Sequence, residues 1–162
     1  DNYDEENFYL TDNTSFIITR LADAASLKTV SKGIDQNLIK ISANICGVSV
    51  NVLRNAINNI IENEDKEIKE LFILILQLYL INGKHKLESI ESKDFVNFCL
   101  AIYIKSNTND LSIIKIKKLL DKWLTKASPN YVKTERMATK NNFRKALYLY
   151  FILLLQQSYL KK

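Results

Sequence analysis

The residues best suited to chemistry lie in the stretch from Leu38 to Ile57, and that chemistry is contact with DNA. Gly47 stands where the chain would turn between two helices, because a residue without a Cβ atom adopts positive φ at little cost. The residue two positions later suits the start of the second helix, since a serine hydroxyl accepts a hydrogen bond from a free backbone N–H. Side chains on the outer face of that helix would reach base edges and phosphates. The predicted DNA-binding residues are Lys40, Ser49, Asn51, Arg54 and Asn55.

The spacing around the glycine is that of a helix-turn-helix unit, which we place at residues 36–62. Ala43 is small enough to let two helices approach closely, and Val48 would fill the joint. Two ordinary packed helices joined by a glycine give a similar pattern, and Ser42 stands where an apolar residue is more usual. Apolar residues then recur at helical spacing and would face the first helix: Leu53, Ala56, Ile57 and Ile60.

A second candidate surface is basic. Residues 1–80 carry 7 Lys/Arg and 12 Asp/Glu, a net charge of −5, whereas residues 81–162 carry 16 and 6, a net charge of +10. Such a half fits a polyanion or an acidic protein partner, although a plain solvated lysine surface has the same composition. A predicted helix at about 111–126 places four lysines on its outer face: Lys115, Lys118, Lys122 and Lys126.

No pattern of side chains indicates catalysis, a metal site or a cofactor. His85 stands alone in a polar loop, and a metal site needs clustered ligands. The sequence contains no Gly-rich phosphate loop, serine elbow or Cys–His pair at catalytic spacing. The carboxylates of residues 62–70 fit a solvated helix start. We therefore predict that the protein is not an enzyme and binds no metal or cofactor. Cys46 and Cys99 are expected to be buried free thiols, with a disulfide left open.

The elements that position these residues are predicted to be helices. Only three glycines and one proline occur in 162 residues, which argues against a strand-and-turn protein. We expect an all-α, compact bundle of about seven helices, cyclin-like or a right-handed superhelix. It would form a single domain at 14–162 after a flexible acidic arm at 1–13. Two apolar runs, at 71–81 and 146–155, are shorter than the ~20 residues that cross a bilayer, so both are expected in the core, with a membrane span as the minor alternative.

The expected inner faces and boundaries follow from apolar spacing. The helix before Gly47 is predicted on Leu38, Ile41 and Ile45. The predicted inner face of the basic helix consists of Leu111, Ile114, Leu119 or Leu120, and Trp123. A polar, basic segment at 127–141 is expected to be a flexible loop before a final helix from about 142. No signal peptide is visible, so an intracellular location, nuclear or cytoplasmic, is expected, with a secreted or surface form left open.

Residues 22–61 resemble the end of a cyclin-type repeat of the transcription factor IIB family. The matching positions are Ala24-Ala25, Gly33, Ile41, the run Ile45-Cys46-Gly47-Val48, and Leu53-Arg54. The resemblance implies that two closing helices form a helix-turn-helix that touches promoter DNA through Ser49, Asn51, Arg54 and Asn55. The usual Thr–x–Lys–Glu approach is absent, and the chain has no zinc ribbon. More weakly, the order of helices from 39 to 123 is similar to domains that bind the RNA polymerase tail.

Two functions are therefore expected. The first is a DNA-binding, transcription-associated factor that uses the stretch 38–57. The second is a helical protein-interaction module, an adaptor, viral or surface protein whose basic C-terminal half meets an acidic partner. The exposure of Asn51, Arg54 and Asn55 separates them, because side chains packed into the domain would be unable to meet DNA.

Overall fold

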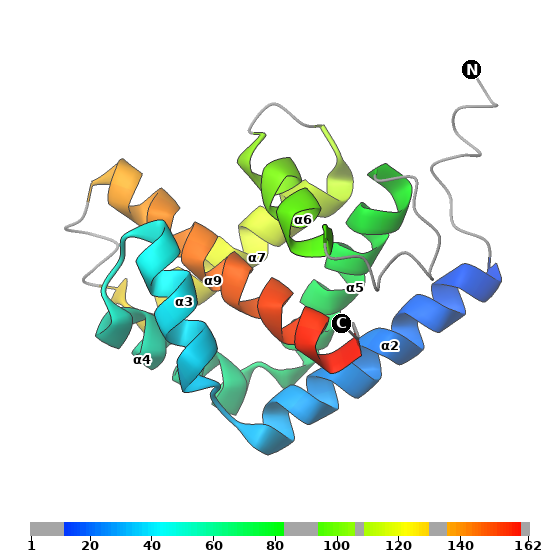
Figure 1. Cartoon of the computed structure of the whole chain (residues 1–162), viewed down its shortest axis with the longest axis horizontal. Helices are drawn as coiled ribbons and strands as arrows, with labels where there is room; N and C mark the ends of the chain where they lie inside the picture. The colour runs from blue at the N-terminus through cyan, green and yellow to red at the C-terminus, as the bar shows by residue number, and fades with distance from the viewer. Residues whose placement is uncertain (1–11, 83–93, 106–108, 130–135, 160–162) are drawn as a thin grey trace.

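The chain forms a bundle of helices (Figure 1). A computed structural model describes residues 12–82, 94–105, 109–129 and 136–159, and all regular structure within these ranges is helical. The predicted all-α bundle of about seven helices is thereby confirmed. Of the predicted acidic arm, only the last two residues lie in the described ranges, and they belong to the first helix. The helices are α2 (Asp12–Lys32), α3 (Gln36–Cys46), α4 (Val50–Asn63), α5 (Asp65–Asn82), α6 (Phe95–Ile104), α7 (Leu111–Ala127) and α9 (Met137–Tyr159).

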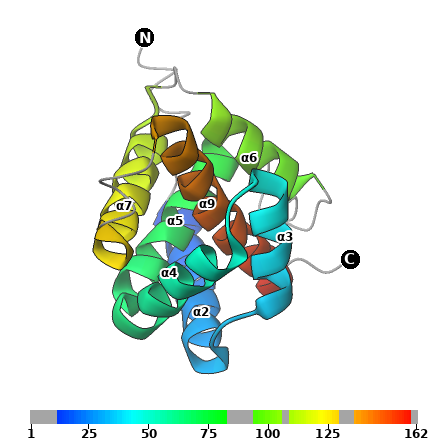
Figure 2. The same ribbon diagram turned by 90° about the vertical axis from the view of Figure 1, so that its left-hand side faces the viewer.

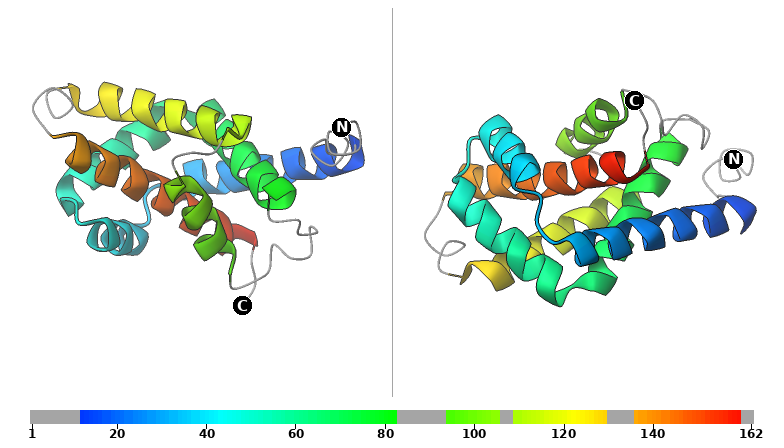
Figure 3. Two further views of the ribbon diagram at one scale, coloured as in Figure 1. Left: turned by 90° about the horizontal axis from the view of Figure 1, so that it is seen from above. Right: turned by 60° about the horizontal axis from the view of Figure 1, so that its bottom comes forward.

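Helix α9 is the centre of the bundle, because it packs against each of the six other described helices. In the right-hand view of Figure 3 it runs between α3 and α6 on one side and α2 and α4 on the other. Its residues 146–152 are all at most 2% exposed. A helix that is apolar all the way round has to be surrounded by protein. Helix α5 has the same character and packs on α2 and α7. No helix among the described residues is long and apolar enough to span a membrane.

Two helices bury only some of the residues that were predicted on their inner faces. On α3, Ile41 and Ile45 are 38% and 59% exposed, and on α7, Leu111 and Ile114 are 71% and 37% exposed. The predicted inner faces were wrong at these positions. Both helices carry apolar residues on more than one face, so spacing alone does not choose between them. Leu38 on α3 and Leu119, Leu120 and Trp123 on α7 are buried as predicted. The other buried residues are Ile39, Ser42, Ala43 and Cys46 on α3, and Ile113, Ile116 and Leu124 on α7.

The final helix begins earlier than predicted. Helix α9 starts at Met137, and the N–H of Lys140 donates to the carbonyl of Arg136 at 3.0 Å. Residues 137–141 are therefore helical, and the prediction of a flexible loop there was wrong. The polar spacing that suggested a loop reflects an exposed first turn of the helix, where side chains face solvent. Residues 130–135 of the predicted loop, and the loop containing His85, lie outside the described residues.

Ser42 is the one buried side chain among the described residues whose oxygen has no hydrogen-bond partner. It is fully buried in α3, at the position where the sequence favours an apolar residue. A desolvated hydroxyl without a partner destabilises the folded state. We therefore expect Ser42→Ala to raise the free energy of unfolding by about 1 kcal/mol, measured by urea denaturation.

Ser26→Ala is the matched control, because Ser26 is also buried but donates to the carbonyl of Asp23 at 2.9 Å. Removing this satisfied hydroxyl should not stabilise the protein. Equal changes in unfolding free energy for the two variants would contradict the explanation.

Candidate functional site

The predicted joint between α3 and α4 is present in the structure. Gly47 has φ 67° and ψ 37°, the left-handed conformation that a helix C-terminus favours for glycine. The N–H of Val48 donates to the carbonyl of Ala43 at 3.0 Å, which closes the end of α3. Ser49 precedes α4, and its hydroxyl accepts a hydrogen bond from the N–H of Val52 at 3.4 Å. The local geometry is therefore that of two helices joined by a tight turn.

The apolar side of α4 closes this joint, while its polar side faces solvent. Leu53 and Ala56 are fully buried. Ser49, Asn51 and Asn55 are exposed, so the side chains predicted to read DNA are accessible. Lys40, the predicted phosphate contact on α3, is also exposed.

Arg54 is half-buried and held in place by its neighbours. Its Nε donates to Oε1 of Gln36 at 2.7 Å, and its Nη1 donates to Oδ1 of Asn51 at 2.7 Å. A guanidinium has five N–H donors, so these two bonds orient it and leave three donors for a ligand. The predicted contact residues Asn51 and Arg54 therefore form one unit on the surface.

The corner formed by α3 and α4 carries no net charge. Within residues 35–63, Lys40 and Arg54 are balanced by Asp35 and Glu62. The carboxylate of Asp35 is occupied at the start of α3, where it accepts from two backbone N–H groups at 3.1 Å. Long-range attraction of a polyanion depends on the summed charge of a surface. Because residues 35–63 have no net charge, cations of neighbouring helices would have to provide that attraction.

The four predicted lysines of α7 do not form one surface of equivalent groups. Lys122 pairs with Glu67 and Lys126 pairs with Glu64. Lys115 and Lys118 are exposed and have no ion pair within the described residues. The prediction that the carboxylates of residues 62–70 are only a solvated helix start was therefore wrong for these two glutamates. Glu67 connects α7 to α5, and Glu64 connects α7 to the junction between α4 and α5.

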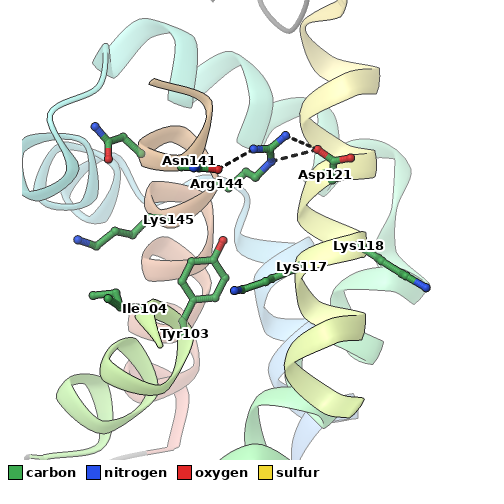
Figure 4. Close-up of a pocket in the computed structure, with 9 residues that line it drawn as sticks. Tyr103, Ile104, Lys117, Lys118, Asp121, Asn141, Arg144 and Lys145 are labelled. Atoms are coloured by element: carbon green, nitrogen blue, oxygen red, sulfur yellow. Dashed lines mark hydrogen bonds and ion pairs between the residues drawn. The ribbon is translucent and has the colours of Figure 1, made fainter. Parts of the chain in front are cut away.

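A basic groove lies between α6, α7 and α9, with a volume of about 640 Å³ (Figure 4). We call it the α6–α7–α9 groove. Of the residues that line this groove, only Lys118 was predicted from the sequence as a candidate site residue. The available signal was two adjacent basic pairs, Lys117-Lys118 and Arg144-Lys145, on two predicted helices. The groove is lined by Tyr103, Ile104, Lys117, Lys118, Asp121, Asn141, Asn142, Arg144 and Lys145.

Contacts across the groove hold its charged groups. Nε of Arg144 donates to Oδ1 of Asp121 at 3.0 Å, and Nη1 donates to Oδ1 of Asn141 at 2.9 Å. Nη2 of the same guanidinium also pairs with Asp121. Nζ of Lys117 lies 5.4 Å from the centre of the Tyr103 ring, within the range of a cation–π interaction. The groove carries four cations and one carboxylate, a net charge of +3.

Tyr103 forms the floor of the groove and stays protonated. Its ring stacks on that of Tyr148 with centroids 4.4 Å apart, and it is 8% exposed. Burial raises the pKa of Tyr103 to about 12, against the opposing effect of Arg144. A neutral phenol is a hydrogen-bond donor as well as an acceptor, so Tyr103 can donate to an anion at neutral pH.

The helix corner and the groove lie at the same end of the molecule. Figure 2 faces this end, where α3, α4, α7 and the first turns of α9 gather.

Burial raises the pKa of the Cys46 thiol at the end of α3, and the nearby charge of Lys145 opposes that rise. Burial also raises the pKa of Cys99 far above its usual value. Both cysteines are free and buried, as predicted.

Comparisons with known proteins identify a family but no characterised relative. A model described as a family of unknown function, DUF8549, matches residues 1–162. Neither a curated protein nor a solved structure matches the chain. No group of three or more His, Cys, Asp or Glu side chains within the described ranges is placed to hold a metal ion. The resemblance to a cyclin-type repeat stays a prediction.

Proposed function

The chain belongs to the DUF8549 family, and because the function of that family is unknown, we propose from the geometry that the protein binds double-stranded DNA through the outer face of α4. One observation carries this proposal. The apolar side of α4 closes the joint with α3, whereas its outer side presents Asn51, Asn55 and an oriented Arg54 to solvent. Such a face has donors and acceptors but no apolar residue that would have to be buried.

The chemistry of this face suits the major groove. That groove is about 12 Å wide and admits a helix. An asparagine amide can donate and accept together at an adenine edge, and a guanidinium can donate twice to guanine or contact a phosphate. The three remaining donors of Arg54 are enough for either contact. The resemblance of residues 22–61 to a transcription factor IIB repeat supports the same proposal, with transcription as its setting.

Phosphate neutralisation would involve cations on both sides of the corner. Lys40 and Arg54 flank the joint, and the α6–α7–α9 groove adds four cations at the same end of the molecule. Each neutralised phosphate releases counterions. The slope of log K against log salt therefore reports how many phosphates the cations of the protein neutralise.

The experiment is fluorescence anisotropy with a labelled mixed-sequence duplex of about 25 base pairs at several salt concentrations. Binding should fall steeply as salt rises. If only Lys40 and Arg54 contact phosphates, the expected slope of log K against log salt is about −2. If the four cations of the groove also contact phosphates, the expected slope is about −5. Absence of binding at low salt would rule out the proposal.

A protein is the second candidate partner. The basic C-terminal half would suit an acidic one, and the exposed apolar pair on α3 favours a protein over DNA. Ile41 and Ile45 are 38% and 59% exposed beside Lys40. Protein interfaces combine an apolar centre with a polar rim, whereas protein–DNA interfaces are more polar. If the protein does not bind the duplex but binds a protein partner through Ile41 and Ile45, the second candidate function is supported.

A further inference from the structure

We propose that the α6–α7–α9 groove binds a phosphate group, which is held by the guanidinium of Arg144, the ammonium of Lys117 and the hydroxyl of Tyr103. These groups come from three different helices, and in Figure 4 all three face the space between α7 and α9. Lys118 and Lys145 also line the groove; their side chains extend from the far sides of α7 and α9 (Figure 4), and their charges add to the positive potential of this surface. The inference stands without the proposed function, because it needs only a free phosphate compound as ligand.

The donors available in the groove match the oxygens of a phosphate. Three of the five N–H groups of Arg144 are used by Asp121 and Asn141, which fixes the guanidinium and leaves two for a ligand. Lys117 offers three N–H groups, and Tyr103 offers one O–H. Charge-assisted hydrogen bonds of this kind are shorter and stronger than neutral ones. A tetrahedral dianion can accept from all three residues together.

Size and charge narrow the class of ligand. A volume of about 640 Å³ is larger than one phosphate ion needs, and it lies within the ~300–1,000 Å³ range of small-molecule sites. The net charge of +3 favours an anion over a neutral molecule. The ligand is therefore a phosphate carried on a larger molecule, either a free phosphate compound or the backbone of a nucleic acid.

Asp121 controls the affinity of this site. Its carboxylate binds the same guanidinium that the phosphate would contact, and it lowers the positive potential of the groove. Removing that negative charge should strengthen binding of an anion, whereas most substitutions in a binding site weaken it. Asp121→Asn keeps the shape of the side chain and still offers an oxygen to Arg144.

The test is calorimetric titration of the full chain with inorganic pyrophosphate at constant ionic strength. We expect Lys117→Gln to weaken binding about tenfold, because it removes a charged hydrogen-bond donor. We expect Asp121→Asn to strengthen binding about three- to tenfold. Lys115→Gln is the matched control, because Lys115 lies on the same helix but does not line the groove, and it should leave the affinity unchanged.

Three results would overturn the proposal. The first is the absence of pyrophosphate binding by the unmodified chain. The second is an equal loss of affinity in Lys115→Gln and Lys117→Gln, which would indicate attraction by overall charge alone. The third is unchanged or weaker binding by Asp121→Asn, in a variant that circular dichroism shows to be folded.

The source of the phosphate is distinguished with the labelled duplex. If Lys117→Gln weakens pyrophosphate binding but leaves duplex binding unchanged, the ligand is a free phosphate compound. If it also weakens duplex binding and makes the salt slope shallower by about 0.9, the groove holds a backbone phosphate. Arg54→Glu should not change pyrophosphate binding. The pyrophosphate titration therefore tests the groove even if the proposed DNA contact through α4 fails.

Discussion

Arg54→Glu is expected to abolish duplex binding while the helical fold stays intact. The change removes one cation from the centre of the outer face of α4 and places a carboxylate where a phosphate or base edge would lie. Loss of a direct contact together with new repulsion should lower the affinity at least ~100-fold at moderate salt. The measurement is fluorescence anisotropy with the same duplex.

The fold should survive this change because the lost hydrogen bonds are at the surface. The two residues that accept from Arg54, Gln36 and Asn51, are exposed and can bond to water instead. Circular dichroism and the thermal unfolding midpoint should therefore remain close to those of the unmodified chain.

Arg20→Glu is the control for a change in net charge. Arg20 lies in the first half of α2, and its guanidinium lies over the ring of Phe16. The first half of α2 is on the side of the molecule away from α3 and α4 (Figure 1). The substitution Arg20→Glu changes the total charge of the protein by the same amount as Arg54→Glu. If both variants lose the same affinity, binding follows total charge and α4 is not the contact surface.

Glu67→Ala is expected to lower the free energy of unfolding by about 2–3 kcal/mol. Oε1 of Glu67 accepts a hydrogen bond from Nε1 of Trp123 at 3.0 Å, and the same carboxylate pairs with Lys122. Trp123 is only 1% exposed, so removing its acceptor leaves a buried N–H without a partner. The pair with Lys122 is exposed and adds little to this cost. Urea denaturation at pH 7 measures the change.

Glu67→Gln separates the hydrogen bond from the charge. The amide oxygen of glutamine can still accept from Trp123, so this variant should lose clearly less stability than Glu67→Ala. If the two variants are equally destabilised, the buried indole N–H is not the cause.

The charge of Glu67 also predicts a dependence on pH. Burial acts to raise the pKa of Glu67, but hydrogen bonds with Lys122 and Trp123 outweigh it, and the pKa falls below its ordinary value of 4.5. The carboxylate therefore stabilises the folded state above that value, and this contribution is lost as the pH falls through the lower pKa of the folded state. The stability difference between the unmodified chain and Glu67→Gln should be constant above pH 5 and shrink towards pH 3. A difference that stays constant down to pH 3 would contradict the lowered pKa.

Local chemistry in the sequence was enough to predict the joint between α3 and α4. A glycine at the turn and a serine at the start of the next helix act within a few residues of themselves, through backbone conformation and capping hydrogen bonds. The structure has Gly47 in the left-handed conformation and Ser49 at the start of α4. The apolar run at 146–155 was equally clear, because a helix without a polar face has to be buried wherever it lies.

The inner faces of α3 and α7 were decided by tertiary structure. The apolar residues of α3 lie on two faces, and packing against α9 and α4 buries Ile39 and Cys46 while Ile41 and Ile45 stay exposed. Periodicity describes one helix at a time. Which of two apolar faces is buried depends on which helices pack against it and on how well their side chains fit together.

The α6–α7–α9 groove and the fastening of α7 to α5 were likewise beyond the sequence alone. Glu67 and Trp123 are 56 residues apart in the chain, and Asp121 and Arg144 are 23 apart. Their side chains meet only because α7 packs on both α5 and α9. The sequence by itself determined that the chain is helical, where it turns between α3 and α4 and which half is basic, but not where α9 begins. The three-dimensional packing decided which lysines are tied to glutamates and which face a groove, because ion pairs and grooves form between helices that are distant along the chain.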